Sequence, residues 1–499
     1  MLHFGSLIAF LLLISLSLAQ NSSSPDLVIE LFRHGARAPL HTTYAPDWYD
    51  YQLGELTTIG MREHYLIGRA LADQYPDILG QNYNLSKIYL RSSVLARSID
   101  SAASQMYGVY EGHGPALNSN SSYPSSRAEP PFISSDIQQI NQNLSNSQAI
   151  PGGYIPIAPN TTTDEGGVTL LEPTQVCFNL ANNILENVLG DEAIQLWEDL
   201  APTRQALQNA GLSVNNPYDL GTLGDALVCD YYDGRTLPGN IDPNSEVYLN
   251  VTFARNWYFT QALWGAEQQR QLLSVPLFNY IFKYFDAKAA GTTDFQFMFL
   301  STAETNLIDL LATLNILTAD CLMDNYKAQL AGQDVPHPNC NYTEFAASII
   351  LEFYNNSGSP TVIFKYNNVP MPVCSGQTEC SYDEFKNLVN QSTNGYTPDD
   401  YKDDCLGRSL PELQAFLEKA GAAFEAKYNG DKTGLENILE DINEDGEGVI
   451  EDISEFVDNV GSDISEHIEN IGSDISQGIE NVGEDIENVI ETIDNIGNN

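Results

Sequence analysis

Positive charge is scarce in this 499-residue sequence, which holds 22 Lys and Arg against 67 Asp and Glu and carries a formal net charge of -45. A protein that binds the phosphate backbone of a nucleic acid needs a basic surface. The composition therefore predicts no nucleic-acid partner. Against this background, the close pair Arg33 and Arg37 is a candidate functional feature.

Long apolar runs are missing beyond the N-terminus. The run from Leu7 to Leu18 ends in small residues and predicts a signal peptide over residues 1–19, cleaved near Ala19. The alternative is an uncleaved anchor or a buried helix, although the run is short for a bilayer span. No later stretch reaches the roughly 18 apolar residues that a membrane-spanning helix needs, so no transmembrane segment is predicted in the mature chain.

The seven cysteines include no CxxC pair. This spacing disfavours a zinc site and is typical of disulfides formed in an oxidising compartment, with one cysteine left unpaired. Glycosylation motifs of the form Asn-x-Ser/Thr support such a location. They lie at Asn84, Asn120, Asn143, Asn160, Asn250, Asn341, Asn355 and Asn390. We therefore expect a glycoprotein without a metal, either secreted or held in a lysosomal or vacuolar lumen.

Strand-like and helix-like segments alternate along most of the chain. Apolar runs rich in β-branched or aromatic residues predict buried strands at 27–32, 87–90 and 295–300. Apolar residues spaced by three and four predict a helix at 58–74, and together these patterns indicate an α/β core. The stretch 112–285 mixes loop-forming residues with helical segments and is interpreted as an inserted, mainly helical cap.

Residues 431–499 differ in composition, with 21 Asp or Glu and Lys432 as the only Lys or Arg. The sequence Gly-Ser-Asp-Ile at 461–464 returns at 472–475, a period of 11 residues. Apolar residues stepping by 4, 4 and 3 form a stripe along a helix with a slight right-handed supercoil. This acidic helical tail predicts self-association or docking on a partner. A solvated, partly helical tail is the alternative, because glycines and like charges oppose a helix.

The segment that carries the chemistry follows the first predicted strand. It reads Arg33-His34-Gly35-Ala36-Arg37-Ala38-Pro39, and ligand sites form where strands of an open α/β sheet end. Guanidinium groups bind phosphate oxygens in pairs, and a neutral imidazole can attack phosphorus. Nearby positive charge lowers the pKa of His34 and keeps it neutral in an acidic compartment. We therefore predict a phosphate pocket with His34 as the nucleophile; the alternative is a structural histidine at a strand end.

The same segment resembles the RHGxRxP signature of the histidine acid phosphatases. Residues 54–65 resemble the family's G-x-L-T-x-x-G-M-x-x-H segment, and residues 91–98 resemble its R-S-T-x-x-x-R segment. Residues 369–374 and 383–385 are similar to its C-terminal region. The resemblance covers about residues 26 to 406 and leaves out the acidic tail.

The resemblance implies a fold and a set of site residues. It implies a three-layer α/β core over residues 25–430, with a mostly parallel sheet, helices on both faces and the inserted cap. Arg33, Arg37 and Arg91 would hold the phosphoryl oxygens, and His34 would be the nucleophile. The resemblance also implies Cys321 as the free thiol and three disulfides, Cys177–Cys405, Cys229–Cys340 and Cys374–Cys380.

One departure from the family lies just after the third predicted strand. Most members have a His-Asp pair there, whose His contacts the phosphate and whose Asp donates a proton, whereas this sequence reads Thr302-Ala303-Glu304. A direct alignment places Ala303 at the histidine. An alignment to the H-A-E-T form of inositol-polyphosphate phosphatases places Thr302 there, and Thr302 is then a phosphate-binding candidate. Both alignments keep Glu304 as the proton donor and lose the second histidine.

The sequence thus predicts an acid phosphatase that hydrolyses small phosphomonoesters through a phosphohistidine and needs no cofactor. The missing histidine removes one charged hydrogen bond to phosphate, which reduces the rate by roughly tenfold to a hundredfold. The alternative is a weak or inactive pseudophosphatase that binds phosphate or a partner. Transfer of the phosphoglycerate mutase kind shares the Arg-His-Gly core, but the signal peptide, cysteines and glycosylation motifs oppose it.

Overall fold

The computed structural model describes residues 24–115, 149–161, 190–356 and 358–405, together with residues 135, 139, 170–171 and 187–188. The predicted signal peptide, the acidic tail, Cys177 and the motifs at Asn120 and Asn143 lie outside the described residues. In the described part, no helix is both long enough and apolar enough to cross a membrane.

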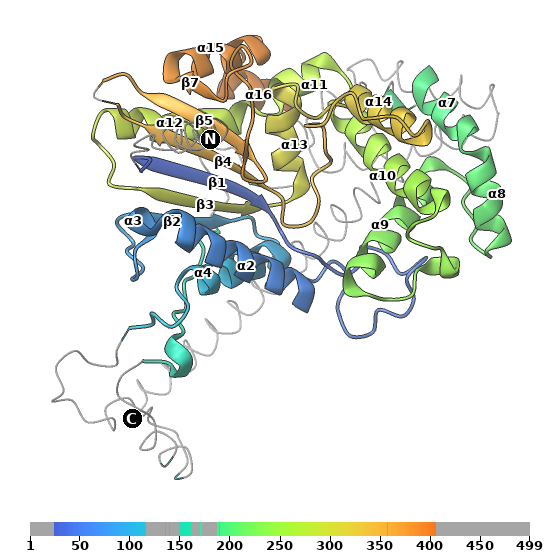
Figure 1. The fold of residues 1–499 in the computed structure, drawn as a ribbon, viewed down its shortest axis with the longest axis horizontal. Helices are drawn as coiled ribbons and strands as arrows, with labels where there is room; N and C mark the ends of the chain where they lie inside the picture. Colours follow the sequence, from blue (N-terminus) through green and yellow to red (C-terminus); the bar gives the residue numbers. More distant parts are fainter. Residues whose placement is uncertain are drawn as a thin grey trace, which may run out of the picture.

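A seven-stranded mixed sheet forms the centre of the described part (Figure 1). Its strands are β1 (Leu27–Arg33), β2 (Ile88–Ser92), β3 (Phe297–Thr302), β4 (Ser348–Tyr354), β5 (Thr361–Tyr366), β6 (Val369–Pro370) and β7 (Glu379–Ser381). The order is β2-β3-β1-β4-β5-β6, with β7 paired to β5. Strands β2, β3 and β1 are parallel neighbours, whereas the other pairings are antiparallel. The predicted α/β class is confirmed. The parallel part of the sheet consists of β1, β2 and β3, which are the three strands predicted from the sequence.

Helices cover both faces of this sheet (Figure 1). One face carries α2 (Thr58–Gln74), α3 (Pro76–Leu79) and α4 (Ala96–Val109), and the other carries α12 (Val275–Ala289) and α13 (Glu304–Thr313). The remaining α-helices are α7 (Asp191–Asp199), α8 (Ala201–Asn209), α9 (Pro217–Asp233), α10 (Glu246–Trp264), α11 (Glu267–Leu272), α14 (Ala319–Leu330), α15 (Tyr382–Ser392) and α16 (Pro398–Cys405). Short 3-10 turns lie at Pro151–Gly153 and Pro238–Asn240.

Strand β1 supplies both apolar layers, because successive side chains of a strand point to opposite faces. Val28 and Phe32 pack beneath α2 and α4, whereas Ile29 and Leu31 pack with the helices of the other face. All seven residues of β1 are buried, which explains why its sequence is predominantly apolar and does not alternate; the buried Glu30 accepts a hydrogen bond from Gln105 at 2.6 Å.

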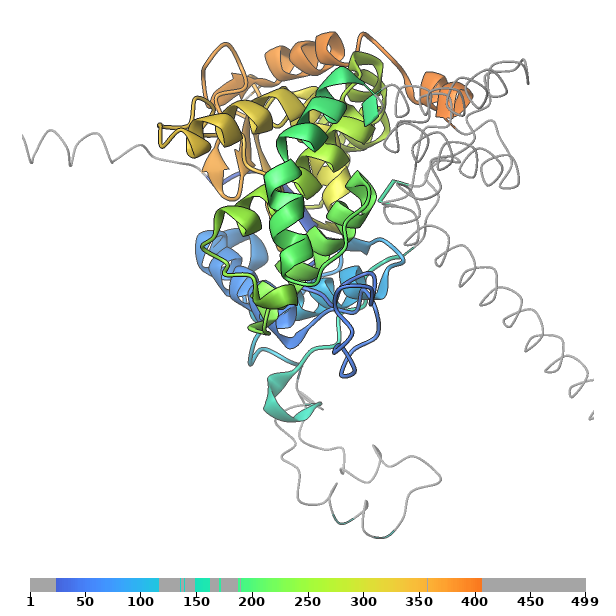
Figure 2. The same ribbon diagram turned by 90° about the vertical axis from the view of Figure 1, so that its right-hand side faces the viewer.

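Helices α7 to α10 lie beyond one end of the sheet, and Figure 2 shows them facing the viewer. Helix α9 packs along α10, and α10 reaches α13 and α14. The rings of Phe253 and Tyr326 stack at 3.7 Å between α10 and α14. These helices fall within the stretch interpreted as a cap, whose boundaries remain a prediction. Their position brings side chains from α9 and α10 close to the ends of β1 and β3.

The disulfides agree only in part with those implied by the resemblance. Cys374–Cys380 is confirmed. Cys340 pairs with Cys321 and not with Cys229, which is a buried free thiol, so the predicted Cys229–Cys340 bond and the predicted free Cys321 are wrong. The reason is local, because Cys321 lies in the first turn of α14 with its Cα 6.2 Å from that of Cys340, within bridging reach. The side chain of Cys405 lies outside the described residues.

The glycosylation motif at Asn250 is not accessible. Its side chain is buried in α10, where Nδ2 donates to Thr203 Oγ1 at 2.8 Å and Oδ1 accepts from the Tyr326 hydroxyl at 2.9 Å. A glycan would require this amide at the surface. The prediction of an acceptor at Asn250 is therefore wrong for the folded chain.

Peptide mapping tests the cysteine assignment. Alkylation of the folded, unreduced protein should leave Cys229 unmodified, because its thiol is fully buried and burial raises its pKa; alkylation after unfolding should label it. A non-reducing digest should contain a peptide linked through Cys321 and Cys340. A linked Cys229–Cys340 peptide would contradict the assignment.

Candidate active site

The Arg33-His34-Gly35 segment leaves the end of β1 and is held there by the backbone of its neighbours. Arg33 pairs in register with Thr302 of β3, and His34 N–H donates to the Thr302 carbonyl at 2.9 Å. On the other side, Ala346 N–H donates to the His34 carbonyl at 3.0 Å. The nucleophile predicted from the sequence is therefore fixed from two sides at the carboxyl ends of parallel strands, where ligand sites form.

Residues 54–65, the second motif, support the loop that follows His34. Thr57 caps the start of α2, and its Oγ1 donates to the Ala36 carbonyl at 3.0 Å. Glu63, six residues further along α2, accepts from Ala36 N–H at 2.8 Å. Gly35 and Gly60 meet without side chains, since a Cβ on Gly60 would lie 2.3 Å from the Ala36 oxygen. The second motif therefore supports the backbone after His34 through hydrogen bonds and close packing.

Residues 91–98, the third motif, run into α4, which also supports the site. Ser301 Oγ of β3 donates to the carbonyl of Ser98 in the motif at 2.7 Å, and Gly35 N–H donates to Oγ of Ser101, one turn further along α4, at 3.1 Å. His64 of the second motif is fully buried and hydrogen-bonds Gln105 of α4 at 2.8 Å. Burial lowers the pKa of His64 to about 4, so this histidine is neutral and structural.

The tautomer of His34 follows from one hydrogen bond. Its Nδ1 lies 2.9 Å from the Gly35 carbonyl oxygen, which can only accept. Nδ1 therefore carries the proton, and Nε2 keeps its lone pair. Burial is the main cause that holds the pKa of His34 well below 6.5, followed by the positive charges of Arg97, Arg33 and Arg37. The imidazole is neutral, as a nucleophile at phosphorus must be.

The arginines of the motif are buried in an ion-pair cluster. Arg33 Nη2 lies 2.6 Å from Glu304 Oε2, and its Nη1 donates to the Thr343 carbonyl at 2.6 Å. Arg37 makes a two-pronged contact with Asp225 of α9, at 2.9 Å and 3.1 Å. Glu304, the first residue of α13, is thus brought to the motif as predicted.

Both carboxylates of this cluster are ionised. Burial acts to raise the pKa of Glu304, but Arg33, Arg255 and Arg37 together hold it below the ordinary value of 4.5. Burial likewise acts to raise the pKa of Asp225, and the guanidinium groups of Arg37 and Arg255 hold it well below its usual range. In the free protein, Glu304 is therefore a carboxylate that forms ion pairs with Arg33 and Arg255.

The two remaining predicted site residues, Arg91 and Thr302, make other contacts than the ion pairs of Arg33 and Arg37. Arg91 is the penultimate residue of β2, one strand beyond β3, with its guanidinium 5.6 Å from the centre of the Tyr280 ring of α12. Thr302 is fully buried, and its hydroxyl is engaged by the Leu171 carbonyl at 3.0 Å and by the side-chain oxygen of Asn306. Ala303 is the N-cap residue of α13 and directly precedes Glu304.

Three charged residues of the site were missed by the sequence analysis. Asp225 and Arg255 come from helices without a recognisable motif, and only their position beside Arg37 and Glu304 shows that they belong to the site. Arg97 lies in the third motif, yet its charge acts on the pKa of His34 more strongly than that of Arg33 or Arg37. The repetition of arginine in that motif was the available signal.

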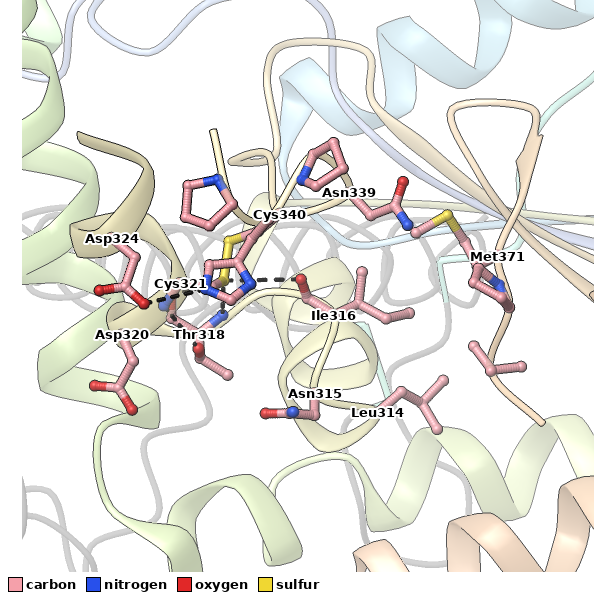
Figure 3. Close-up of a pocket in the computed structure, with 15 residues that line it drawn as sticks. Leu314, Asn315, Ile316, Thr318, Asp320, Cys321, Asp324, Asn339, Cys340 and Met371 are labelled. Atoms are coloured by element: carbon pink, nitrogen blue, oxygen red, sulfur yellow. Dashed lines mark hydrogen bonds and ion pairs between the residues drawn. A yellow bond between two sulfur atoms is a disulfide. The ribbon is translucent and has the colours of Figure 1, made fainter. Parts of the chain in front are cut away.

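A separate hollow of about 510 Å³ lies beside the start of α14 (Figure 3). It is lined by the Cys321–Cys340 disulfide and by apolar side chains that include Met371, and Asp324 pairs there with His337 at 3.1 Å. None of the predicted site residues lines this hollow, and its carboxylates oppose phosphate. Among the described residues, no group of three or more His, Cys, Asp or Glu side chains is arranged to hold a metal.

The chain is similar in sequence to acid phosphatases and in structure to a phytase. Residues 26–151 match the histidine phosphatase superfamily (branch 2). The chain is 33% identical over 118 residues to a lysosomal acid phosphatase of Xenopus laevis, a match that spans 22% of this chain and 27% of that protein. It is 24% identical over 388 residues to the lysosomal acid phosphatase of Rattus norvegicus, which spans 75% of this chain and 78% of that protein. A phytase from Citrobacter braakii superposes with a TM-score of 0.49 at 12% identity, over 76% of this chain and 99% of that one.

The contact between Gly60 and the Ala36 backbone leads to a stability test. Gly60→Ala should lower the free energy of unfolding by about 1 to 3 kcal/mol, since backbone atoms must shift to admit the methyl group. Gly221→Ala is the matched control, because Gly221 lies within α9 with open space around it. That variant should gain about 0.5 to 1 kcal/mol from helix propensity. Denaturant unfolding measures both, and equal effects would contradict the packing role.

Proposed function

Because the chain belongs to the histidine acid phosphatase family, we propose that it hydrolyses phosphate monoesters through a phosphohistidine formed on His34. The hydrogen bond from His34 Nδ1 to the Gly35 carbonyl carries this proposal. It leaves Nε2 as the unprotonated nitrogen of a neutral ring, held among guanidinium groups that suit a phosphoryl dianion.

The first step is phosphoryl transfer to the protein. Nε2 of His34 attacks phosphorus, the new P–N bond forms, and the P–O bond to the alcohol breaks. Arg33 and Arg37 neutralise the phosphoryl oxygens, which is the main electrostatic contribution to this kind of reaction. Arg91 and Thr302 are the further phosphate-binding candidates from the sequence. Glu304 protonates the leaving oxygen.

The second step returns the protein to its starting state. Water attacks the phosphohistidine, Glu304 takes a proton from that water, and inorganic phosphate leaves as the P–N bond breaks. The same carboxyl group thus serves as acid and then as base. No cofactor enters either step.

Substrate arrival changes the protonation of Glu304. Its carboxylate is ionised in the free protein because Arg33 and Arg255 lie beside it. A phosphate dianion competes for these guanidinium groups and offsets their charge, and the pKa of Glu304 then rises. The proton donor is therefore formed by substrate binding, and an acidic surrounding favours it.

The location belongs to the same proposal. The N-terminal apolar run, the cysteines and the relatives named lysosomal acid phosphatases support a lysosomal or secreted lumen protein. Exposed glycosylation motifs at Asn84, Asn160, Asn341 and Asn390 are compatible with that compartment. Small phosphate esters are the proposed substrates.

Hydrolysis of p-nitrophenyl phosphate between pH 3 and 8 tests the nucleophile. Wild type should turn over and keep its activity below pH 6.5, because the lowered pKa of His34 keeps that ring neutral there. His34→Ala should lose turnover. Trapping of the intermediate by alkaline quench, which preserves phosphohistidine, should succeed only with His34 present. Wild-type turnover equal to that of His34→Ala, with phosphate still bound, would identify a pseudophosphatase instead.

A comparison of leaving groups tests the proton donor. Glu304→Gln should reduce kcat for an alkyl phosphate by about 10² to 10⁴, the range for a general acid. The reduction should be smaller for p-nitrophenyl phosphate, whose leaving group departs without a proton. Asp324→Asn, a carboxylate change outside the site, should leave both rates unchanged. Equal losses on the two substrates would exclude the acid role of Glu304.

Restoring a histidine tests which residue replaces the family's second one. Ala303→His should raise kcat/KM by roughly tenfold to a hundredfold through a charged hydrogen bond to phosphate. Thr302→His should instead lower the melting temperature, because the Thr302 side chain is fully buried and hydrogen-bonded. Steady-state kinetics and thermal unfolding measure the pair. A stable, more active Thr302→His would favour the other alignment.

A further inference from the structure

Arg255 of α10 lies between the two carboxylates of the site. Its Nη2 is 3.3 Å from Asp225 Oδ1 and 3.7 Å from Glu304 Oε1. Asp225 is at the same time held by Arg37, and Glu304 by Arg33. Charges of opposite sign therefore alternate along a single chain of contacts, in the order Arg33, Glu304, Arg255, Asp225, Arg37.

These contacts join three guanidinium groups to two carboxylates of the described residues, and Arg33 also interacts electrostatically with Glu63. Side chains of Arg33 and Arg37 are 3% and 2% exposed, and that of Arg255 is 13% exposed. Burying a surplus charge is costly unless a counter-ion accompanies it. Besides burial, the positive charges of Arg33 and Arg37 lower the pKa of His34, so an anion that enters the cluster meets positive charge.

Helix packing keeps Arg255 in place. Gly224 of α9 faces it, and a Cβ on Gly224 would lie 2.8 Å from the Cβ of Arg255. The absence of a side chain at Gly224 lets the stem of Arg255 pass against α9 and bring the guanidinium to Asp225. Its second terminal nitrogen donates to Asn256 at 2.8 Å. The guanidinium plane is therefore oriented by contacts on two sides.

We propose that Arg255 is a phosphate-binding residue and supplies, from α10, the positive charge that the missing second histidine would have supplied after β3. This inference rests on the proposed function and deepens it. Arg255 lies beside the proton donor Glu304, so the bound phosphoryl group is held between Arg255 and the arginines of the motif. Asp225 is a positioning residue, which orients Arg37 and Arg255 together.

Binding of inorganic phosphate, measured by calorimetry, tests the role of Arg255 without requiring turnover. Arg255→Gln should weaken phosphate binding by about tenfold to a hundredfold, the effect of one charged hydrogen bond. Arg204→Gln is the matched control. Arg204 is a partly buried arginine of α8 that stacks on Trp197 at 3.9 Å, outside the site, and its loss should leave phosphate affinity unchanged.

The pH dependence of hydrolysis adds a readout that a merely structural role would not move. Removing Arg255 takes a positive charge from the side of Glu304 and raises the pKa of that carboxyl group. The alkaline limb of kcat/KM, which reports loss of the donor's proton, should therefore move to higher pH in Arg255→Gln. Arg255→Lys keeps the positive charge but loses the two-pronged hydrogen bonding of the guanidinium group. In this variant the alkaline limb of kcat/KM should stay closer to that of wild type, while phosphate still binds several-fold more weakly.

Each outcome of the phosphate-binding experiment either supports or overturns the role of Arg255. If wild type binds phosphate and Arg255→Gln binds it more weakly, the inference stands even where no turnover is found and the proposed hydrolysis fails. Wild-type phosphate affinity in a folded Arg255→Gln overturns the inference, whatever the turnover. Should thermal unfolding show that Arg255→Gln does not fold, Arg255→Lys decides, since undiminished phosphate affinity in that variant excludes a guanidinium contact.

Discussion

The burial of arginine charge beside a neutral histidine is the constraint on which the site depends. Arg33 and Arg37 are almost without solvent contact, so each needs a partner in the protein. Glu304 and Asp225 are those partners, and they come from α13 and α9. The same positive charge, together with burial, keeps His34 unprotonated. The neutral form of His34 and the attachment of α9 and α13 to the Arg33–Arg37 segment therefore have a common electrostatic origin.

Some of the motifs recognised in the sequence supply side chains to the candidate site, whereas others support the backbone of that site. The α/β class, the first three strands and the approach of Glu304 to the Arg33–Pro39 segment could be predicted, because predominantly apolar runs mark strands buried on both faces and ligand sites form where such strands end. The segment at 54–65 could be recognised but not explained from letters alone. Its contribution is a set of contacts to the Ala36 backbone, and such contacts become visible only in three dimensions.

Other features could not be predicted, for physical reasons that differ. Asp225 and Arg255 belong to helices whose sequence shows no pattern, and their role comes from side-chain geometry across α9, α10 and α13. The pairing of Cys321 with Cys340 depends on where α14 begins. The motif at Asn250 satisfies the glycosylation pattern, yet its amide is consumed by hydrogen bonds inside the helical region. A sequence pattern reports residue types and spacing, not solvent exposure.

The contact between Gly35 and Gly60 also limits how this pocket can diversify. Any side chain at either position would run into backbone, which cannot move aside as a flexible side chain can. The floor beneath the nucleophile is therefore closed to gradual change by substitution. Side chains that can be exchanged more readily come from α9 and α10, which contribute Asp225 and Arg255. The candidate site thus combines a part in which backbone packs on backbone with a part built from side chains that can be exchanged.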